Sequence, residues 1–235
     1  MEERTMTSNK ECRAFNFEVR AEENEQHGTY ITGLPIVFDQ ATDLGWCQET
    51  IARTALDGTD LKDVRFLIGH DTSMVPLARS RNNNENSTMQ MTVTERGLEI
   101  RVDLDVKGNP RAAELYSAVK RGDISGMSFM FTVAKDSWAD VDSDYPKRTV
   151  ESISRVLEVS AVAFPAYESS EIQVASEDTA LDSARASLES ARQKLAEERA
   201  AQEAAEAAEQ AARAEEERRT AALERLNNLI GGIKP

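Results

Sequence analysis

The sequence predicts an α+β fold: a mainly antiparallel β-barrel-like body with a few helices, followed by a long C-terminal α-helix. Short apolar runs of strand length alternate with turn residues up to about residue 170. From Ala175 to Leu229 there is no glycine or proline, and alanine, glutamate, arginine and glutamine dominate, which favours one uninterrupted helix. We therefore expect a disordered N-terminus over residues 1–12, a folded domain over 13–170, and an Ala/Glu/Arg-rich helix over 171–235.

Composition narrows the possible partners. The 235 residues carry a formal charge of −14, and an acidic surface does not favour nucleic acid or an anionic membrane. No run approaches the roughly 18 apolar residues of a membrane helix, so we expect neither partner. Cys12 and Cys47 lack CxxC spacing and no signal peptide is evident, which favours an intracellular, reduced protein. With two histidines and two isolated cysteines, we expect no metal and no cofactor.

Several short strands make up the predicted body. Alternating apolar residues predict a first strand over 13–20, and a polar turn over 24–28 leads into a second. The segment 89–104 predicts a hairpin that turns at Gly97, and residues 136–147 read as an acidic loop around Trp138.

The stretch from Val64 to Asp71 is an apolar run of strand length that ends in Gly69-His70-Asp71. A histidine at a strand end is held in place and can be reached by a substrate. Because it titrates near neutral pH, His70 could take a proton from a hydroxyl and return it to a leaving amine. The alternative is that His70 only caps the turn by hydrogen bonding.

A helix and a strand surround the most informative serine. Asn109 is a suitable N-cap, Pro110 suits the first helical position, and Gly122 ends the helix. From residue 124, period-two alternation predicts a strand with Met127, Phe129, Phe131 and Val133 on one face and Ser128 on the other. Ser128 could be a nucleophile, or merely a small residue in a half-buried strand.

The segment 156–164 is a nearly continuous apolar strand, which implies burial on both faces, yet it contains Glu158. A buried carboxylate is costly unless it is paired or hydrogen-bonded. Its partner should be either an arginine, giving a structural ion pair, or His70, giving a base with its orienting acid.

The predicted C-terminal helix carries an a/d-like seam that could bind a partner or a second copy of the chain. The residues of this seam are Leu181, Ala184, Leu188, Ala191 and Leu195, and an apolar stripe resumes at Leu223, Leu226 and Leu229. The alternative is a solvated single helix, held by pairs such as Glu189 with Arg192.

Four ordered segments resemble the signatures of the tailed-phage (caudovirus) prohead maturation proteases, which are serine peptidases distantly similar in fold to the herpesvirus assembly protease. The segments are 38–45, 67–71, 121–131 with Ser-Gly-Met-Ser-Phe, and 157–165 with Glu-Val-Ser-Ala-Val-Ala-Phe-Pro, so the resemblance covers roughly residues 15–168. It implies His70 as the base and Ser128, rather than Ser125, as the nucleophile. Herpesvirus enzymes use a second histidine, but none follows His70 here, so Glu158 takes the third place. Met130 stands where the family usually has glycine.

The resemblance implies a serine endopeptidase of capsid maturation. In that reading residues 13–170 are a prohead protease domain that works in the host cytoplasm, inside the immature phage prohead. Its substrates would be the scaffold or the scaffold-like segment of the major capsid protein, and the protease itself. The C-terminal helix would serve self-association or packaging.

Two other classes of protein compete with this reading. One is a non-catalytic scaffolding or assembly protein that acts through its C-terminal coiled coil. The other is a metal hydrolase that uses acids on the β-hairpins, namely Asp63, Asp71, Asp103 and Asp105. Acidic side chains on β-hairpins usually only face the solvent and bind no metal.

Overall fold

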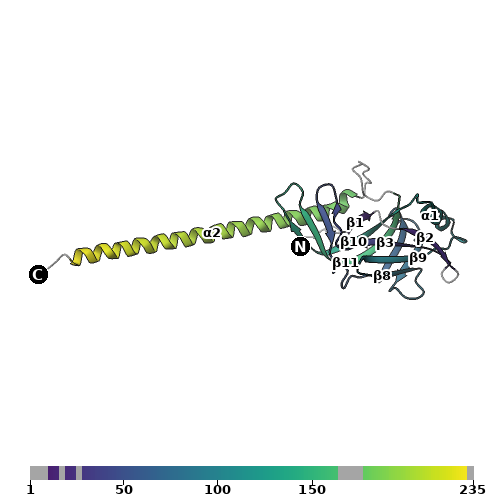
Figure 1. Ribbon diagram of the computed structural model, residues 1–235, viewed down its shortest axis with the longest axis horizontal. Coiled ribbons are helices and arrows are strands. Elements are labelled where there is room, and N and C mark those ends of the chain that lie inside the picture. Colours follow the sequence, from purple (N-terminus) through teal and green to yellow (C-terminus); the bar gives the residue numbers. More distant parts are fainter. Residues whose placement is uncertain (1–9, 16–18, 25–27, 164–176, 232–235) are drawn as a thin grey trace, which may run out of the picture. The chain divides into compact units, whose positions relative to one another are not determined.

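The computed structural model describes residues 10–15, 19–24, 28–163 and 177–231, which form eleven strands and two helices in these ranges (Figure 1). The strands are β1 (Lys10–Phe15), β2 (Arg20–Asn24), β3 (Gly28–Val37), β4 (Thr42–Asp43), β5 (Gln48–Ile51), β6 (Asp63–Ile68), β7 (Ala78–Arg81), β8 (Met89–Val93), β9 (Gly97–Asp103), β10 (Gly126–Ala139) and β11 (Lys147–Val162). The helices are α1 (Pro110–Arg121) and α2 (Glu177–Gly231).

The larger sheet has seven strands. Its main order is β1-β10-β11-β5-β4, and a branch adds β6 beside β11 and β7 beside β6. The long β10 and β11 pair antiparallel along most of their length, whereas β11 runs parallel to β5 at its start and to β6 at its end. The apolar end of β11 therefore has a neighbour on each side, and this confirms the prediction of burial for this strand.

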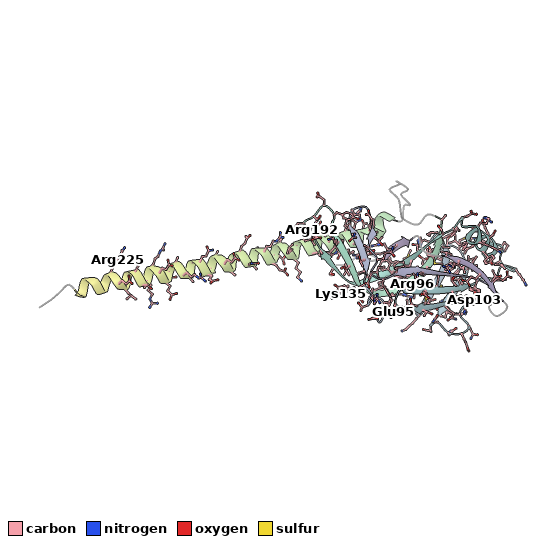
Figure 2. All side chains as sticks on the ribbon, viewed as in Figure 1. Glu95, Arg96, Asp103, Lys135, Arg192 and Arg225 are labelled. Carbon is pink, nitrogen blue, oxygen red and sulfur yellow. The ribbon has the colours of Figure 1, made fainter. Side chains whose placement is uncertain are left out.

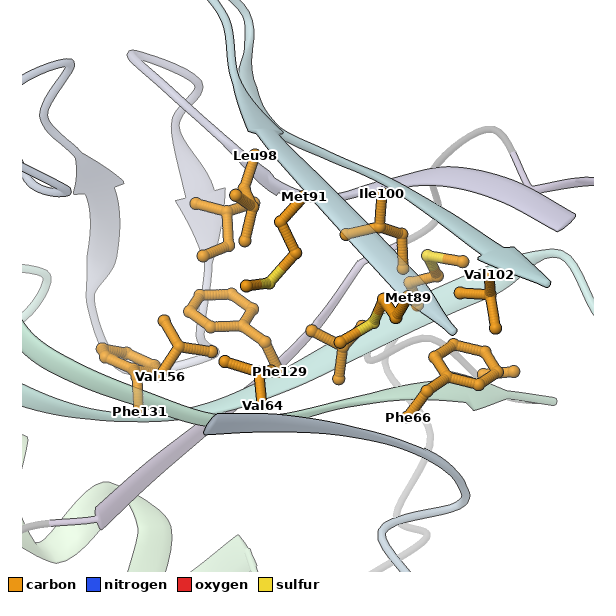
Figure 3. Packing of buried hydrophobic residues seen from close by; sticks show 14 of the residues in the cluster. Val64, Phe66, Met89, Met91, Leu98, Ile100, Val102, Phe129, Phe131 and Val156 are labelled. Atoms are coloured by element: carbon orange, nitrogen blue, oxygen red, sulfur yellow. The ribbon is translucent and has the colours of Figure 1, made fainter. Parts of the chain in front are cut away.

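The smaller sheet has four strands in the order β2-β3-β9-β8. Its side chains meet those of β6, β10 and β11 in one core (Figure 3). Figure 3 labels Met89, Met91, Leu98, Ile100 and Val102 from β8 and β9, and Val64, Phe66, Phe129, Phe131 and Val156 from the larger sheet. This core fixes which face of β10 and β11 points inward, and so which face remains for polar side chains.

The predicted helix before the serine strand is confirmed. Asn109 caps α1 by accepting a hydrogen bond from the Arg111 N–H, and Pro110 is the first helical residue. Gly122 ends the helix in the left-handed region, with φ of 81°. The chain then enters β10 at Gly126, two residues before Ser128.

Other predictions about the body need correction. The described strands form two open sheets and do not close into a barrel. Residues 10–12 start β1, and the single strand predicted over 13–20 is divided between β1 and β2. The acidic segment that starts at Asp136 is not all loop, because its first four residues extend β10 and place Trp138 in the sheet.

The helix α2 contributes to two compact units, residues 1–188 and 189–235. In the first unit Ala184 and Leu188 are buried, and Ser183 and Ser187 donate hydrogen bonds to Glu11 and Asp136 of the larger sheet. Part of the predicted partner-binding seam is therefore used within the body.

In the second unit α2 is largely exposed as far as its side chains are described, and Figure 2 shows charged side chains along it, including Arg192 and Arg225. The predicted pair of Glu189 and Arg192 is present at 2.8 Å, and Arg213 pairs with Glu209 at 2.6 Å. No helix among the described residues is long and apolar enough to span a membrane.

Candidate active site

Three neighbouring strands, β6, β10 and β11, bring the candidate side chains to one face of the larger sheet. Ser128 of β10 lies opposite Ser160 of β11, and Met130 lies opposite Glu158. Directly paired residues share a face, and so do residues two apart along a strand. Ser128, Glu158 and Ser160 therefore lie on the face opposite to Phe129 and Val159, which pack in the core.

His70 reaches this face from a tight turn at the end of β6. Gly69 and His70 both adopt left-handed backbone, with φ of 59° and 61°. This conformation is costly for a residue with a side chain and is often found at functional sites. The turn is held by the Gly69 N–H, which donates to the Ala161 carbonyl at 3.0 Å, and by the His70 N–H, which donates to the Ser160 hydroxyl at 3.1 Å.

Glu158 is the partner of His70. Its Oε1 lies 2.5 Å from His70 Nδ1, and its Oε2 accepts a hydrogen bond from Ser160 Oγ at 2.6 Å. Of the two partners considered for this buried carboxylate, the structure therefore provides the histidine. Both carboxylate oxygens are hydrogen-bonded, which satisfies the requirement for burying a charged group.

The surroundings raise the pKa of His70 to about 10. Burial alone would lower it, but the contacts with Cys12 and Glu158 and the negative charge of Glu158 outweigh burial. At neutral pH the resting site therefore holds an imidazolium paired with a carboxylate.

Ser128 is fully buried and lies beside this pair without a direct hydrogen bond to it in the described structure. Its hydroxyl donates to the main-chain carbonyl of Arg13 in β1 at 2.8 Å. The Cys12 sulfur lies 3.6 Å from Ser128 Oγ and 3.2 Å from His70 Nε2, so it stands between the hydroxyl and the imidazole. Cys12 is thus the link between the two groups in the resting arrangement.

A buried ion-pair cluster joins β1 to β5 and β11 and consists of Glu11, Arg13, Glu49 and Arg148, each 3% exposed or less. Arg13 makes a bidentate contact with Glu49, with distances of 2.6 Å and 2.7 Å. Arg148 contacts both glutamates and, through Nε, Asp136 at 2.7 Å. This pairing raises the pKa of both guanidinium groups despite their burial, so both arginines stay charged.

A metal ion fits the site poorly. The donor atoms of Cys12, His70 and Glu158 lie within 4.8 Å of one another. However, Glu158 and Nδ1 of His70 already bond to each other, which leaves only a sulfur and one nitrogen, whereas zinc sites in proteins use three or four ligands.

The other candidate residues have structural roles. Cys47 is buried, and burial together with the charge of Glu49 raises the pKa of its thiol to about 12, so it is not a nucleophile at neutral pH. Asp63 pairs with Arg79 at 2.6 Å, Asp103 pairs with Arg101 at 3.1 Å, and Asp71 accepts hydrogen bonds from Ser73. Ser125 is exposed and lies just before β10.

Sequence reasoning missed Ser160, Cys12 and the ion-pair cluster. Ser160 could have been found, because it stands two residues after Glu158 on the same strand and so shares its face. The cluster offered no local signal, since Arg148 and Glu11 are 137 positions apart. Cys12 lay in a segment that looked too polar to be ordered.

A histidine paired with a buried carboxylate beside a serine is the set of side chains that serine hydrolases use. The sequence profile of the Caudovirus prohead serine protease family matches residues 15–183, which is most of the chain, and the chain belongs to this family. It is 32% identical over 91 residues to the prohead protease of Enterobacteria phage HK97, and this match spans 39% of each protein.

Among solved structures, the bacteriophage T4 capsid assembly protease, gp21, overlaps 66% of this chain and 99% of its own, with 13% identity and a TM-score of 0.35.

Proposed function

We propose that this chain is a serine endopeptidase of phage capsid maturation, with Ser128 as nucleophile, His70 as general base and acid, and Glu158 as the group that orients His70. The observation that carries the proposal is the 2.5 Å contact between Glu158 and His70 Nδ1, on the sheet face where Ser128 also lies. Membership in a serine protease family supports it.

The chemistry follows from these groups. Ser128 Oγ attacks the carbonyl carbon of a peptide bond while neutral His70 takes the hydroxyl proton. The tetrahedral intermediate breaks its C–N bond, and the proton on His70 passes to the leaving amine, which leaves an acyl ester on Ser128. Water, deprotonated by His70, then cleaves the ester and restores the serine. Glu158 holds Nδ1 protonated and stabilises the imidazolium formed in each half of the reaction.

The resting arrangement is not yet competent for this reaction. The Ser128 hydroxyl donates its hydrogen bond to the Arg13 carbonyl. His70, with a pKa of about 10, is already protonated at neutral pH. Direct proton transfer requires the two groups to approach to about 2.6–3.2 Å. The proposal therefore includes a rearrangement that removes the Cys12 sulfur from between them.

The proposed substrates are the scaffold or the scaffold-like segment of the major capsid protein, and the protease itself, inside the immature prohead in the host cytoplasm. Similarity to the HK97 prohead protease supports this, although the chain spans only 39% of the length of that relative. The proposal includes a fold related to the herpesvirus assembly protease, which the sheet-rich body with few helices supports.

The part of α2 beyond Leu188 is proposed to mediate self-association or packaging into the shell. Its exposed, uninterrupted helix supports this role. We propose residues 13–170 as the protease domain, with the start of α2 packed onto it.

Labelling with a fluorophosphonate tests the nucleophile directly. The full chain, Ser128→Ala and the control Ser125→Ala are incubated with the probe over a range of pH, and adducts are located by peptide mass spectrometry. We expect an adduct on Ser128 in the wild-type and Ser125→Ala chains and none in Ser128→Ala. We also expect the first two to shorten themselves over hours while Ser128→Ala stays intact. If none of the three chains carries an adduct and all three stay full length, the proposal is refuted.

A further inference from the structure

We propose that β1 occupies the place of an extended peptide substrate, and that the site beside β10 accepts a segment with arginine on the acyl side of the bond to be cut. This inference rests on the proposed function and adds to it the mode of binding and the class of substrate. The argument depends on how β1 sits against Ser128, His70 and Glu49.

β1 lies at the end of the larger sheet, and β10, which carries Ser128, is its strand partner. Ser128 has no exposed surface, and two groups of β1 contact its hydroxyl: the Arg13 carbonyl at 2.8 Å and the Cys12 sulfur at 3.6 Å. A substrate can reach the hydroxyl only if β1 leaves. The departure of β1 would expose the edge of β10, and an extended peptide adds to such an edge through main-chain hydrogen bonds.

The register of β1 presents one particular peptide bond to the serine. Ala14 lies opposite Ser128, and the carbonyl of Arg13, one residue earlier, accepts the hydroxyl proton. The Arg13–Ala14 bond is therefore the bond next to the nucleophile. A substrate strand in the same register would place its own carbonyl there.

The Arg13 side chain fills a site built for a guanidinium. Glu49 holds it through two hydrogen bonds, of 2.6 Å and 2.7 Å, and the group lies 5.6 Å from the centre of the Phe131 ring. Neither Glu49 nor Phe131 belongs to β1, so both remain when β1 leaves. Without β1, the buried carboxylate of Glu49 and the partly exposed carboxylate of Asp136 would face a single guanidinium, that of Arg148. The remaining negative charge favours an incoming cation, and the fork of arginine matches a bidentate carboxylate.

The position of Cys12 indicates which side chain should precede the arginine in the substrate. Its sulfur is 3.2 Å from Nε2 and 3.6 Å from Nδ1 of His70, and a sulfur in line with either N–H could not be nearly equidistant from both nitrogens. It therefore lies against the ring. In a bound substrate, the side chain of the residue before the arginine would contact the imidazole here and must leave the space between Ser128 Oγ and His70 open for proton transfer. A small apolar side chain suits this contact.

These observations together describe the substrate: an extended segment with a small residue, then arginine, then the cleaved bond. β1 itself, Lys-Glu-Cys-Arg-Ala-Phe, has this form. It is held uncleaved because its Arg13 carbonyl only accepts a hydrogen bond from the Ser128 hydroxyl, and the protonated His70 cannot act as a base.

Peptide binding to chains without the nucleophile tests the inference separately from catalysis. Two full-length chains are compared by fluorescence anisotropy, Ser128→Ala alone and Ser128→Ala with Arg13→Glu, which sets a like charge beside Glu49 and releases β1. The probe is a labelled peptide with the sequence of residues 10–15, and the matched control peptide has alanine in place of arginine. Circular dichroism checks the fold, and Arg13→Gln replaces Arg13→Glu if the latter unfolds.

We expect the arginine peptide to bind the Arg13→Glu chain at least about ten-fold more tightly than the Ser128→Ala chain, because charge-assisted hydrogen bonds to Glu49 become available. On the Arg13→Glu chain, the alanine peptide should bind at least about ten-fold more weakly than the arginine peptide. Equal weak binding to both folded chains, or binding that does not depend on arginine, overturns the inference.

A second measurement does not require any change at Arg13. The wild-type chain digests an unfolded protein, and the new ends are sequenced by mass spectrometry. Cuts concentrated after arginine support the inference. Cuts without that preference overturn it and leave the proposed peptidase standing. Absence of cutting would instead count against the proposed peptidase, and the binding experiment would still decide the inference.

Discussion

Oε1 of Glu158 lies 2.5 Å from Nδ1 of His70, and this contact joins two residues 88 positions apart in the sequence. It forms because β11 runs parallel to β6 with Glu158 opposite Arg65 and Ala161 opposite Ile68, so that the turn after β6 returns over the carboxylate. The strand pairing therefore affects the chemistry of the site, because a carboxylate beside an imidazole favours the protonated form of the imidazole.

Glu158→Gln should lower the pKa of His70 from about 10 toward its ordinary value of 6.5, because it removes a negative charge and an acceptor for the protonated ring. NMR titration of the His70 ring protons measures this shift. Activity should fall on the order of a hundred-fold or more, because the ring loses its orienting acid. An unchanged His70 pKa would show that Glu158 does not control the ring.

In the wild-type chain, activity should rise as pH increases toward about 10, because only neutral His70 can act as a base. The free energy of unfolding should instead decrease as pH increases. The raised pKa of His70 stabilises the fold below its ordinary value of 6.5, and this contribution is lost as pH rises through about 10. Rates and urea unfolding, measured over the same pH series, check both directions. Rates that fall steadily from pH 7 to 10 on a folded chain would contradict this expectation.

Ser160→Ala should reduce kcat about ten-fold with little change in KM, since Ser160 positions Glu158 and the His70 main chain without touching a substrate. The apparent pKa of the pH–rate profile should also shift, which a purely structural defect would not cause. The matched control is Ser154→Ala on the same strand, where the exposed hydroxyl donates only to the Thr132 carbonyl. Equal effects of the two substitutions would remove the positioning role.

Arg148→Met should destabilise the fold by about 3–5 kcal/mol, because it leaves the buried carboxylates of Glu11 and Glu49 with a single counter-charge, that of Arg13. Arg155→Met on the same strand should cost less than about 1 kcal/mol. Arg155 is exposed, and its ion pair with Asp60 is long, at 3.7 Å. Urea denaturation of both variants gives the comparison. Similar costs would mean that the ion-pair cluster contributes little.

The same cluster predicts sensitivity to acid. Burial alone would raise the pKa of Glu11, but hydrogen bonds from Arg148 and the charges of Arg13 and Arg148 outweigh burial and lower it. A lowered carboxyl pKa contributes stability above its ordinary value of 4.5, and that stability is lost as pH falls below it. The free energy of unfolding should therefore decrease below about pH 4.5 in the wild type, and less steeply in Glu11→Gln. Parallel curves would rule out Glu11 as a source of this dependence.

Much of the body could be predicted because its signals are local. The caps of α1, the alternation after Ile124 and the apolar run around Glu158 each depend on neighbouring residues. Sheet closure could not be predicted, because it depends on which strands pair, and the parallel pairing of β11 with both β5 and β6 leaves no local signal.

The candidate site divides in the same way. His70 and Ser128 stand in short motifs, and Glu158 was noticed as a charge in an apolar strand. Cys12 and Arg13 were missed because their relevance comes only from the pairing of β1 with β10. Ser128 lies 116 positions from Cys12, and Glu49 lies 36 positions from Arg13.

The hydroxyl groups of Ser183 and Ser187 show where this polypeptide can be shortened without harm. A version that stops at residue 170 would strip hydrogen-bond donors from Glu11 and Asp136 and uncover the surface that Ala184 and Leu188 shield. It would loosen β1 for reasons unrelated to any partner of the helix. Truncation from residue 189 onward retains these anchors, so only that version separates the role of the arm from the integrity of the enzyme.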